Sequence, residues 1–263
     1  MLGKLLKYEI KFTYKTFLAL FLSVLALSGI NKLFMIIGTY ENSLFSFLSV
    51  LMIFAYVIIT LSSFIISLVI IIQRFYKNLF SNEGYLSFTL PVKPYMHIIS
   101  KCITAIIWII LNVITIAASL CILFSGDNHI TSFFQDIFKY FDFLKLYIGS
   151  TTVITFVIEF ILIAIMSLIF QTLFIYLSIS IGNLFNKHKI FASFSAYIII
   201  FILIQVVNSF ILSFCLPGYS EQTAEITFLT SNLFPIVIAS NRIFSLIFFF
   251  LTNFILTRHL NLE

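Results

Sequence analysis

The sequence predicts an all-α polytopic membrane protein with six transmembrane helices and an N-terminal cytoplasmic interfacial amphipathic helix. Of its 263 residues, 61% are hydrophobic and only 10% are charged, whereas a soluble domain carries about 25% charged residues. The mean hydropathy is +1.14, and the apolar runs reach the ~20 residues that a helix needs to cross a bilayer. These runs lack the alternation of apolar and polar residues that is typical of β-strands. With only 8 Gly and 4 Pro, the chain also has few residues that favour the many turns of a β-barrel.

Six apolar segments are expected to span the membrane, at about 16–37, 45–73, 98–124, 150–180, 190–215 and 233–257. The first segment is expected to be a span and not a cleaved signal peptide, because it is long enough to cross and lacks an Ala-x-Ala-like site. No soluble domain fits between the segments. Cys102, Cys121 and Cys215 lie in or beside them and are predicted to be small buried hydrophobes.

Residues 1–15 are predicted to form an amphipathic helix in the cytoplasmic interface that then turns into the first span. On a helical projection four lysines share an arc of about 80°: Lys4, Lys7, Lys11 and Lys15. The opposite side carries Leu2, Leu5, Leu6, Ile10 and Phe12. Glu9 projects from the apolar side, where it either meets a basic partner on a neighbouring helix or protein or is a surface residue of a frayed helix.

The distribution of basic residues predicts that both termini are cytoplasmic. One side of the predicted bundle collects Lys4, Lys7, Lys11, Lys15, Arg74, Lys77, Lys93, Lys101, Lys187, Lys189 and Arg258, and the other side only Lys32, Lys139 and Lys145. The net charge of +5 is therefore spread near span ends, which favours a topological role over nucleic-acid binding. We expect a multi-pass protein of the cell membrane.

A second interfacial helix is predicted at about 131–146 on the outer side. Its apolar positions recur at helical spacing and are Phe133, Phe134, Ile137, Phe138, Phe141 and Leu144. The other face carries Gln135, Asp136, Lys139, Asp142 and Lys145. Aromatic residues are enriched at membrane boundaries, so a lipid-interface helix is favoured over an aromatic surface that grips substrate.

The cytoplasmic loop at 74–97 is the longest cytoplasmic connection. It is expected to hold a span end, a short amphipathic segment and a break near Pro91, because Pro91 and Pro94 stop helix formation. A stiff, aromatic-rich segment that projects from the cytoplasmic face is suited to bind another protein.

The chain resembles the type-2 ABC transporter permeases, the membrane halves of ATP-binding-cassette exporters, and especially the small six-span permeases of low-GC Gram-positive bacteria. The resemblance covers nearly the whole chain. It rests on Leu5-Leu6-Lys7-Tyr8-Glu9-Ile10-Lys11, on Glu83-Gly84-Tyr85-Leu86-Ser87-Phe88-Thr89-Leu90-Pro91-Val92, and on Leu260-Asn261-Leu262-Glu263. The middle motif is the most specific of the three.

The resemblance implies roles for these segments. The N-terminal helix would be the connecting helix, with Lys7, Tyr8, Glu9 and Lys11. The loop would hold the coupling helix that docks on the ATPase, with Asn82, Glu83, Gly84, Tyr85, Phe88, Thr89, Leu90 and Pro91. The connection between spans five and six would enter the outer leaflet as short re-entrant helices. Pro217-Gly218 and Pro235 are compatible with breaks between such helices, and equally with ordinary loops.

The chain itself carries no nucleotide-binding motif, since none of its eight glycines stands in a Gly-x-x-x-x-Gly-Lys-Ser/Thr arrangement. We therefore expect no enzymatic activity and no cofactor on this chain, with ATP and Mg bound by a separate cytoplasmic ABC ATPase subunit. The four histidines His97, His129, His188 and His259 are scattered and form no metal-binding pattern. No Gly-x-Ser-x-Gly motif indicates a hydrolase.

Glu159 and Arg242 are ionisable residues inside predicted spans, where charges are costly and usually face the bundle interior or a wet cavity. Each lies nine residues into its span, which is about 13 Å from the outer boundary at 1.5 Å per residue. Their similar depth and opposite charge favour a structural pair over a role in contacting substrate. Asn112, Gln171, Gln205, Asn208 and Asn253 are assigned to packing through interhelical hydrogen bonds.

The sequence thus favours the permease subunit of an ATP-driven exporter, with a second permease copy or a homologous permease as partner. Its abundant aromatic residues suit amphipathic or hydrophobic cargo such as antimicrobial or toxin peptides, although they are equally ordinary lipid-facing residues. The alternative from another class is a non-transporting membrane sensor or immunity protein that binds peptide at the outer face. A secondary transporter ranks third, because no inverted repeat or mid-membrane helix break is evident.

Overall fold

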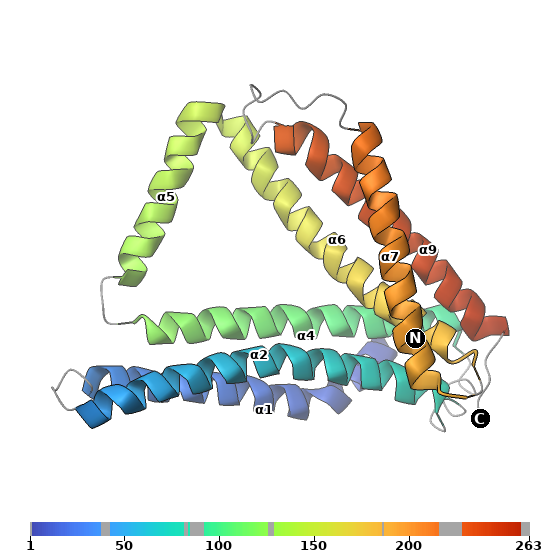
Figure 1. Cartoon of the computed structure of the whole chain (residues 1–263), viewed down its shortest axis with the longest axis horizontal. Helices are drawn as coiled ribbons and strands as arrows, with labels where there is room; N and C mark the ends of the chain where they lie inside the picture. Colours follow the sequence, from blue (N-terminus) through green and yellow to red (C-terminus); the bar gives the residue numbers. More distant parts are fainter. Residues whose placement is uncertain are drawn as a thin grey trace. The chain divides into compact units, whose positions relative to one another are not determined.

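The computed structural model describes residues 2–37, 43–81, 84, 92–125, 129–185, 187–215 and 228–258. In chain order the elements are α1 (Leu2–Ile37), α2 (Ser43–Phe80), α4 (Pro94–Leu123), α5 (His129–Ile148), α6 (Ser150–Gly182), α7 (Lys189–Cys215), the π-helical turn η1 (Leu229–Leu233) and α9 (Phe234–Arg258) (Figure 1). The described residues contain no strand. The predicted all-α class is confirmed.

Six helices are long and apolar enough to cross a membrane: Leu2–Ile36, Phe47–Phe80, Pro94–Leu123, Ser150–Gly182, Lys189–Phe214 and Leu229–Arg258. They correspond one to one to the six predicted spans. The second helix continues past the predicted end at residue 73 to Phe80, because the segment Arg74–Phe80 contains neither Gly nor Pro. Pro94 occupies the first position of α4, where a missing N–H is tolerated.

The turn that was expected after residue 15 does not occur in α1, which runs unbroken from Leu2 to Ile37. No Gly or Pro interrupts residues 4–28, and two threonine hydroxyls donate back to the preceding turn, Thr13 to the Glu9 carbonyl at 2.9 Å and Thr16 to the Thr13 carbonyl at 2.8 Å. A separate N-terminal amphipathic helix is therefore not confirmed.

The predicted outer helix at 131–146 lies within α5, which is not among the six candidate spans. On its polar side the Lys145 Nζ lies 2.9 Å from the Asp142 carboxylate in an exposed ion pair. Gly149 separates α5 from α6 with a φ of 98°, a conformation that costs glycine little because it has no Cβ. The position of α5 at a membrane interface stays a prediction.

The chain divides into two compact units, one made of Met1–Gln73 and Ile103–Ile137 and the other of Arg74–Cys102 and Phe138–Glu263. In the first unit, polar side chains join the helices. Asn112 donates to the Ser67 hydroxyl at 2.8 Å and accepts from the Ser63 hydroxyl at 3.2 Å. The Tyr56 and Ser119 hydroxyls lie 2.7 Å apart. These contacts tie α2 to α4 at two levels, and the predicted interhelical role of Asn112 is confirmed.

Residues of α1 complete the polar contacts of the first unit. The Asn31 amide donates to the Met52 carbonyl of α2 at 3.0 Å, and the Trp108 indole N–H of α4 donates to the Thr13 hydroxyl at 2.9 Å. Phe17 stacks on Trp108 with ring centroids 4.4 Å apart and an angle of 3° between the planes. An aromatic stack and two hydrogen bonds therefore hold α1 against α2 and α4.

In the second unit α6 packs against both α7 and α9. Aromatic rings fill these contacts: Phe174 stacks on Tyr197 of α7 at 4.4 Å, and Phe170 lies 5.6 Å from Phe248 of α9. The Gln171 amide donates to the Tyr197 hydroxyl at 3.3 Å. Gln171 is thus a second predicted packing residue that joins two helices.

Polar residues lie inside the helix contacts while large apolar residues lie outside, the reverse of a soluble protein. Asn112, Ser119 and Thr252 are at most 1% exposed, whereas Phe54 and Phe250 are 66% and 65% exposed. This distribution is stable where the surrounding medium is apolar and buried hydroxyls and amides bond across helices. Cys102 is buried as predicted, but the prediction is wrong for Cys121, which is exposed; its place on the outer surface of α4 reflects the same preference for an apolar exterior.

Candidate functional site

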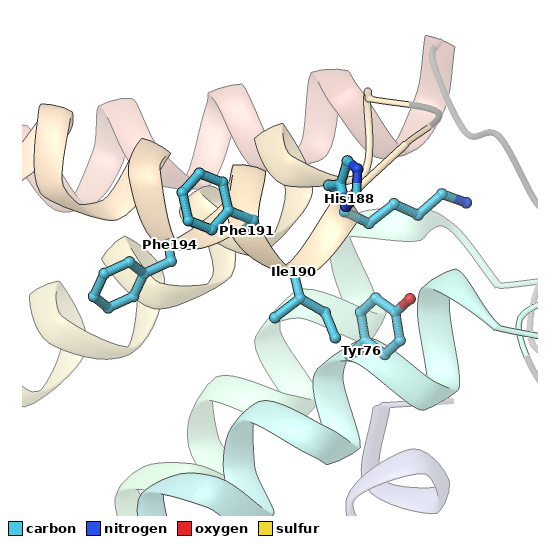
Figure 2. Close-up of a pocket in the computed structure, with 6 residues that line it drawn as sticks. Tyr76, His188, Ile190, Phe191 and Phe194 are labelled. Carbon is cyan, nitrogen blue, oxygen red and sulfur yellow. The ribbon is translucent and has the colours of Figure 1, made fainter.

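A groove of about 620 Å³ opens in the second unit between the end of α2 and the start of α7. Its lining residues are Tyr76, His188, Lys189, Ile190, Phe191 and Phe194. Figure 2 shows Ile190 pointing toward Tyr76, with Phe191 and Phe194 further along α7. The groove lies at the end of the candidate span Phe47–Phe80 and at the start of the candidate span Lys189–Phe214.

Tyr76 is positioned by aromatic packing at the end of α2. Its neighbour Phe75 is fully buried and stacks on Tyr176 of α6, with centroids 3.9 Å apart and planes 4° from parallel. The Lys101 Nζ of α4 donates to the Arg74 carbonyl at 3.4 Å. With Phe75 directed into the helix contact, the next residue along the turn, Tyr76, faces the groove.

The connection between α6 and α7 positions the other wall. Asn183 ends α6 by donating from its side chain to the Ile179 carbonyl at 2.9 Å. His188 then adopts a left-handed φ of 58°, and its carbonyl accepts the first bond of α7, from the Ala192 N–H at 2.9 Å. This left-handed residue turns the chain so that the first turns of α7 carry Lys189, Ile190 and Phe191 into the groove.

The surroundings of the groove are strongly basic. The described residues within 71–81, 92–101 and 183–194 include no Asp or Glu. They include Arg74, Lys77, Lys93, Lys101, Lys187 and Lys189. Such a one-signed cluster attracts anions at short range and is screened by salt at longer range. For a metal ion, the described residues place no group of three or more His, Cys, Asp or Glu side chains together.

Most of the predicted ATPase-coupling residues lie outside the described residues: Asn82, Glu83, Tyr85, Phe88, Thr89, Leu90 and Pro91. Gly84 is described; it is buried, and its N–H donates to the Ser81 carbonyl at 2.7 Å. The proposed contact of this segment with an ATPase stays a prediction.

The predicted connecting-helix residues occupy the first turns of α1. Lys7, Tyr8 and Lys11 are exposed, and Glu9 is half-buried. The other two lysines of the predicted basic face, Lys4 and Lys15, are exposed as well. These residues lie in the first unit, and the groove residues lie in the second.

Glu159 and Arg242 do lie in candidate spans, on α6 and α9. The span that contains Glu159 begins at Ser150, as predicted, whereas the span that contains Arg242 begins at Leu229, four residues before the predicted start. In these described helices the two side chains form no ion pair: the Glu159 Oε2 is buried without a hydrogen-bond partner, and Arg242 is exposed. Asn253 on α9 likewise has a buried, unbonded Oδ1.

This arrangement predicts that Glu159→Gln leaves the free energy of unfolding unchanged or raises it by about 1 kcal/mol, because an unpaired intramembrane carboxylate is costly. The measurement is unfolding of the purified chain in detergent by SDS, followed by helical circular dichroism. Arg242→Gln is the companion variant. If each variant lowers the free energy of unfolding by more than about 1 kcal/mol, and the double mutant lowers it by no more than either single change, the two residues pair.

Sequence reasoning missed the groove. Lys187 and Lys189 were noted only as topological signals, and Tyr76 was noted only as part of a loop. The available signal was the row of large apolar residues, Ile190, Phe191 and Phe194, directly after these lysines, since such a pattern is typical of a span end at the lipid boundary. No sequence signal paired this row with the end of α2, because Tyr76 and His188 are 112 positions apart in the chain.

Comparisons with protein-family models, with curated proteins and with solved structures find no match to this chain. The class that the fold defines is a helical membrane protein with six candidate spans.

Proposed function

We propose that the chain is the membrane-spanning permease subunit of an ATP-driven ABC exporter, working with a separate cytoplasmic ATPase and a second permease copy or homologue. The proposal rests on the groove, at which the end of α2 lies next to the start of α7. The segment after α2 carries the motif Glu83 to Val92. The end of α2 and the start of α7, which the basic residues assign to one side of the membrane, thus lie together in the second unit.

Such an arrangement suits mechanical coupling. A partner that pushes on the connection between α2 and α4 acts on α6 through the Phe75–Tyr176 stack and the 3.2 Å contact between the Cys102 sulfur and the Thr172 hydroxyl. Both contacts are buried and leave little room for local deformation. A push is therefore passed to α6 and to α7 and α9 packed on it, which is what switching between two packings of a bundle requires.

The test is recovery of a Walker-motif ATPase with the tagged chain from its own membranes, followed by ATP-driven transport in liposomes. We expect recovery to fall about tenfold in Glu83→Lys, because a reversed charge in a protein contact costs more than 1 kcal/mol. Glu41→Lys, on the side predicted to face outward, is the matched control and keeps the partner. A labelled amphipathic peptide is expected to move only when ATP is present.

Three outcomes contradict the proposal. The tagged chain recovers no Walker-motif protein, or it moves peptide without nucleotide, or residues 82–92 react with an impermeant label added from outside. Peptide binding at the outer face without any transport favours the sensor or immunity alternative.

A further inference from the structure

We propose that one face of α7 is the contact with a second copy of this chain. The face carries residues at the alternating three- and four-residue spacing of a coiled coil, which we call the α7 stripe: Ser195, Ile198, Ile202, Gln205, Ser209 and Leu212. In the contact, two α7 helices run parallel about a twofold axis, and the Gln205 amides of the two copies hydrogen-bond to each other.

The α7 stripe lies on the side of the helix opposite to α6, the helix on which α7 packs. The side toward α6 carries Ser193, which lies against Gly182. It also carries Tyr197, which stacks on Phe174. On a helical projection at 100° per residue, these two α7 residues lie about 150° and about 110° from the middle of the stripe. The stripe residues are exposed, except for the half-buried Ser195.

Gln205 is the residue of the stripe that requires a partner. It lies nine residues before the end of the candidate span Lys189–Phe214, which is about 13 Å inside it at 1.5 Å per residue. Its side chain is exposed, and none of the described residues forms a hydrogen bond with it. Lipid tails neither donate nor accept hydrogen bonds, so an amide that faces them is costly. From this depth a glutamine side chain is too short to reach the headgroups, and a polar group of another chain has to satisfy it.

The charges of the amide favour a second copy as this partner. The amide oxygen accepts and the NH2 group donates, so the partial charges of the group are complementary to themselves. About a twofold axis each Gln205 donates to the other, and one contact satisfies both chains. Ser209 keeps the helices close, because it is small and its hydroxyl already donates to the Val206 carbonyl at 2.8 Å. A single polar residue among apolar core positions such as Ile198 and Ile202 fixes the register of such a pair.

This inference is independent of the proposed function, since the contact forms without nucleotide or ATPase. If the contact is absent, an exporter that pairs with a homologous permease remains. If no ATPase is recovered with the chain, the contact remains.

The test is disulfide cross-linking of the full chain in its own membranes, in a background with Cys102→Ser, Cys121→Ser and Cys215→Ser. We expect Ile202→Cys to form a disulfide-linked dimer under a mild oxidant, because residues of the stripe meet their counterparts near the axis. Leu203→Cys is the matched control, since Leu203 is 58% exposed and Ile202 is 55% exposed. Leu203 points about 100° away from Ile202. We expect it to cross-link about fivefold less, because its Cβ atoms lie beyond the reach of a disulfide.

Two further variants test the amide itself. Adding Gln205→Leu to Ile202→Cys is expected to reduce the dimer about threefold, which is the average contribution of an interhelical hydrogen bond in a membrane. Gln205→Asn keeps an amide and is expected to retain most of the dimer.

Equal cross-linking of Ile202→Cys and Leu203→Cys overturns the proposal, as does an unchanged dimer in Gln205→Leu. A cross-linked product whose mass is not twice that of the chain also overturns it and assigns the stripe to a different protein. If Ile202→Cys forms no cross-linked product, the proposal is wrong and the stripe is covered by lipid or by another part of the same chain.

Discussion

Gly182→Ala is expected to lower the free energy of unfolding of the second unit by about 3 kcal/mol, the upper end for forcing an atom into a packed contact. Gly182 ends α6 where α7 crosses it, and a Cβ at this position lies 2.6 Å from the Ser193 Cα and 2.5 Å from its backbone nitrogen. These are backbone atoms, so no change of rotamer relieves the overlap. The two helices have to separate, and the groove formed at the start of α7 is lost with them.

The measurement follows the reaction of a thiol dye with Cys102 during heating, in a background with Cys121→Ser and Cys215→Ser. Cys102 is buried and contacts Thr172 of α6, so its reactivity reports opening of the second unit. Gly29→Ala is the matched control, because a Cβ at Gly29 in α1 meets nothing within 4 Å and alanine is the better helix former by about 1 kcal/mol. The interpretation fails if Cys102 becomes reactive at the same temperature in Gly182→Ala as in the control. It also fails if adding Ser193→Gly restores stability, since that change removes only the Ser193 side chain and leaves its backbone atoms in place.

Trp108→Ala is expected to lower the free energy of unfolding of the first unit by about 3 kcal/mol, as buried tryptophan truncations do. The indole joins α4 to α1 in two ways, by stacking on the fully buried Phe17 and by donating to the Thr13 hydroxyl. Much of the loss is lost packing, because lipid tails do not drive apolar helix faces together as water does. The measurement is SDS unfolding followed by helical circular dichroism.

Two further variants separate the contributions. Trp108→Phe keeps a ring against Phe17 and loses the hydrogen bond, so we expect a loss of about 1 kcal/mol. Phe54→Ala, which truncates an aromatic residue that is 66% exposed on α2, is expected to change stability by less than about 0.5 kcal/mol. Equal losses in Trp108→Ala and Phe54→Ala contradict the assigned role of Trp108.

The spans could be predicted because each helix satisfies its own backbone, and a run of apolar residues of bilayer length is enough to specify it. The predicted starts at 150 and 190 lie within one residue of the helix starts at Ser150 and Lys189. The prediction was less accurate at α2, whose last turns carry Arg74 and Lys77 and lower the local hydropathy without breaking the helix. The turn expected in α1 failed for a similar reason: a change in amphipathicity at residue 15 is not a change in backbone preference.

The candidate site could be predicted only in part. Similar depth and opposite charge suggested that Glu159 and Arg242 meet, and both are indeed in spans. Depth alone does not specify which way a side chain points around the helix axis, however, and Arg242 is exposed while the Glu159 Oε2 is buried without a partner. The direction of each helix face depends on the packing of its neighbours, which no single segment encodes.

The amino-acid sequence by itself determined the number and the approximate positions of the candidate membrane helices and the grouping of basic residues at their ends, because hydropathy and charge act locally along the chain. Only the tertiary structure decided that Phe75 stacks on Tyr176, that Gly182 lies against Ser193 and that Tyr76 lines one groove with Phe191. The physical reason is that these contacts join residues up to 115 positions apart, and their energy comes from the fit of two surfaces and not from the preference of either segment.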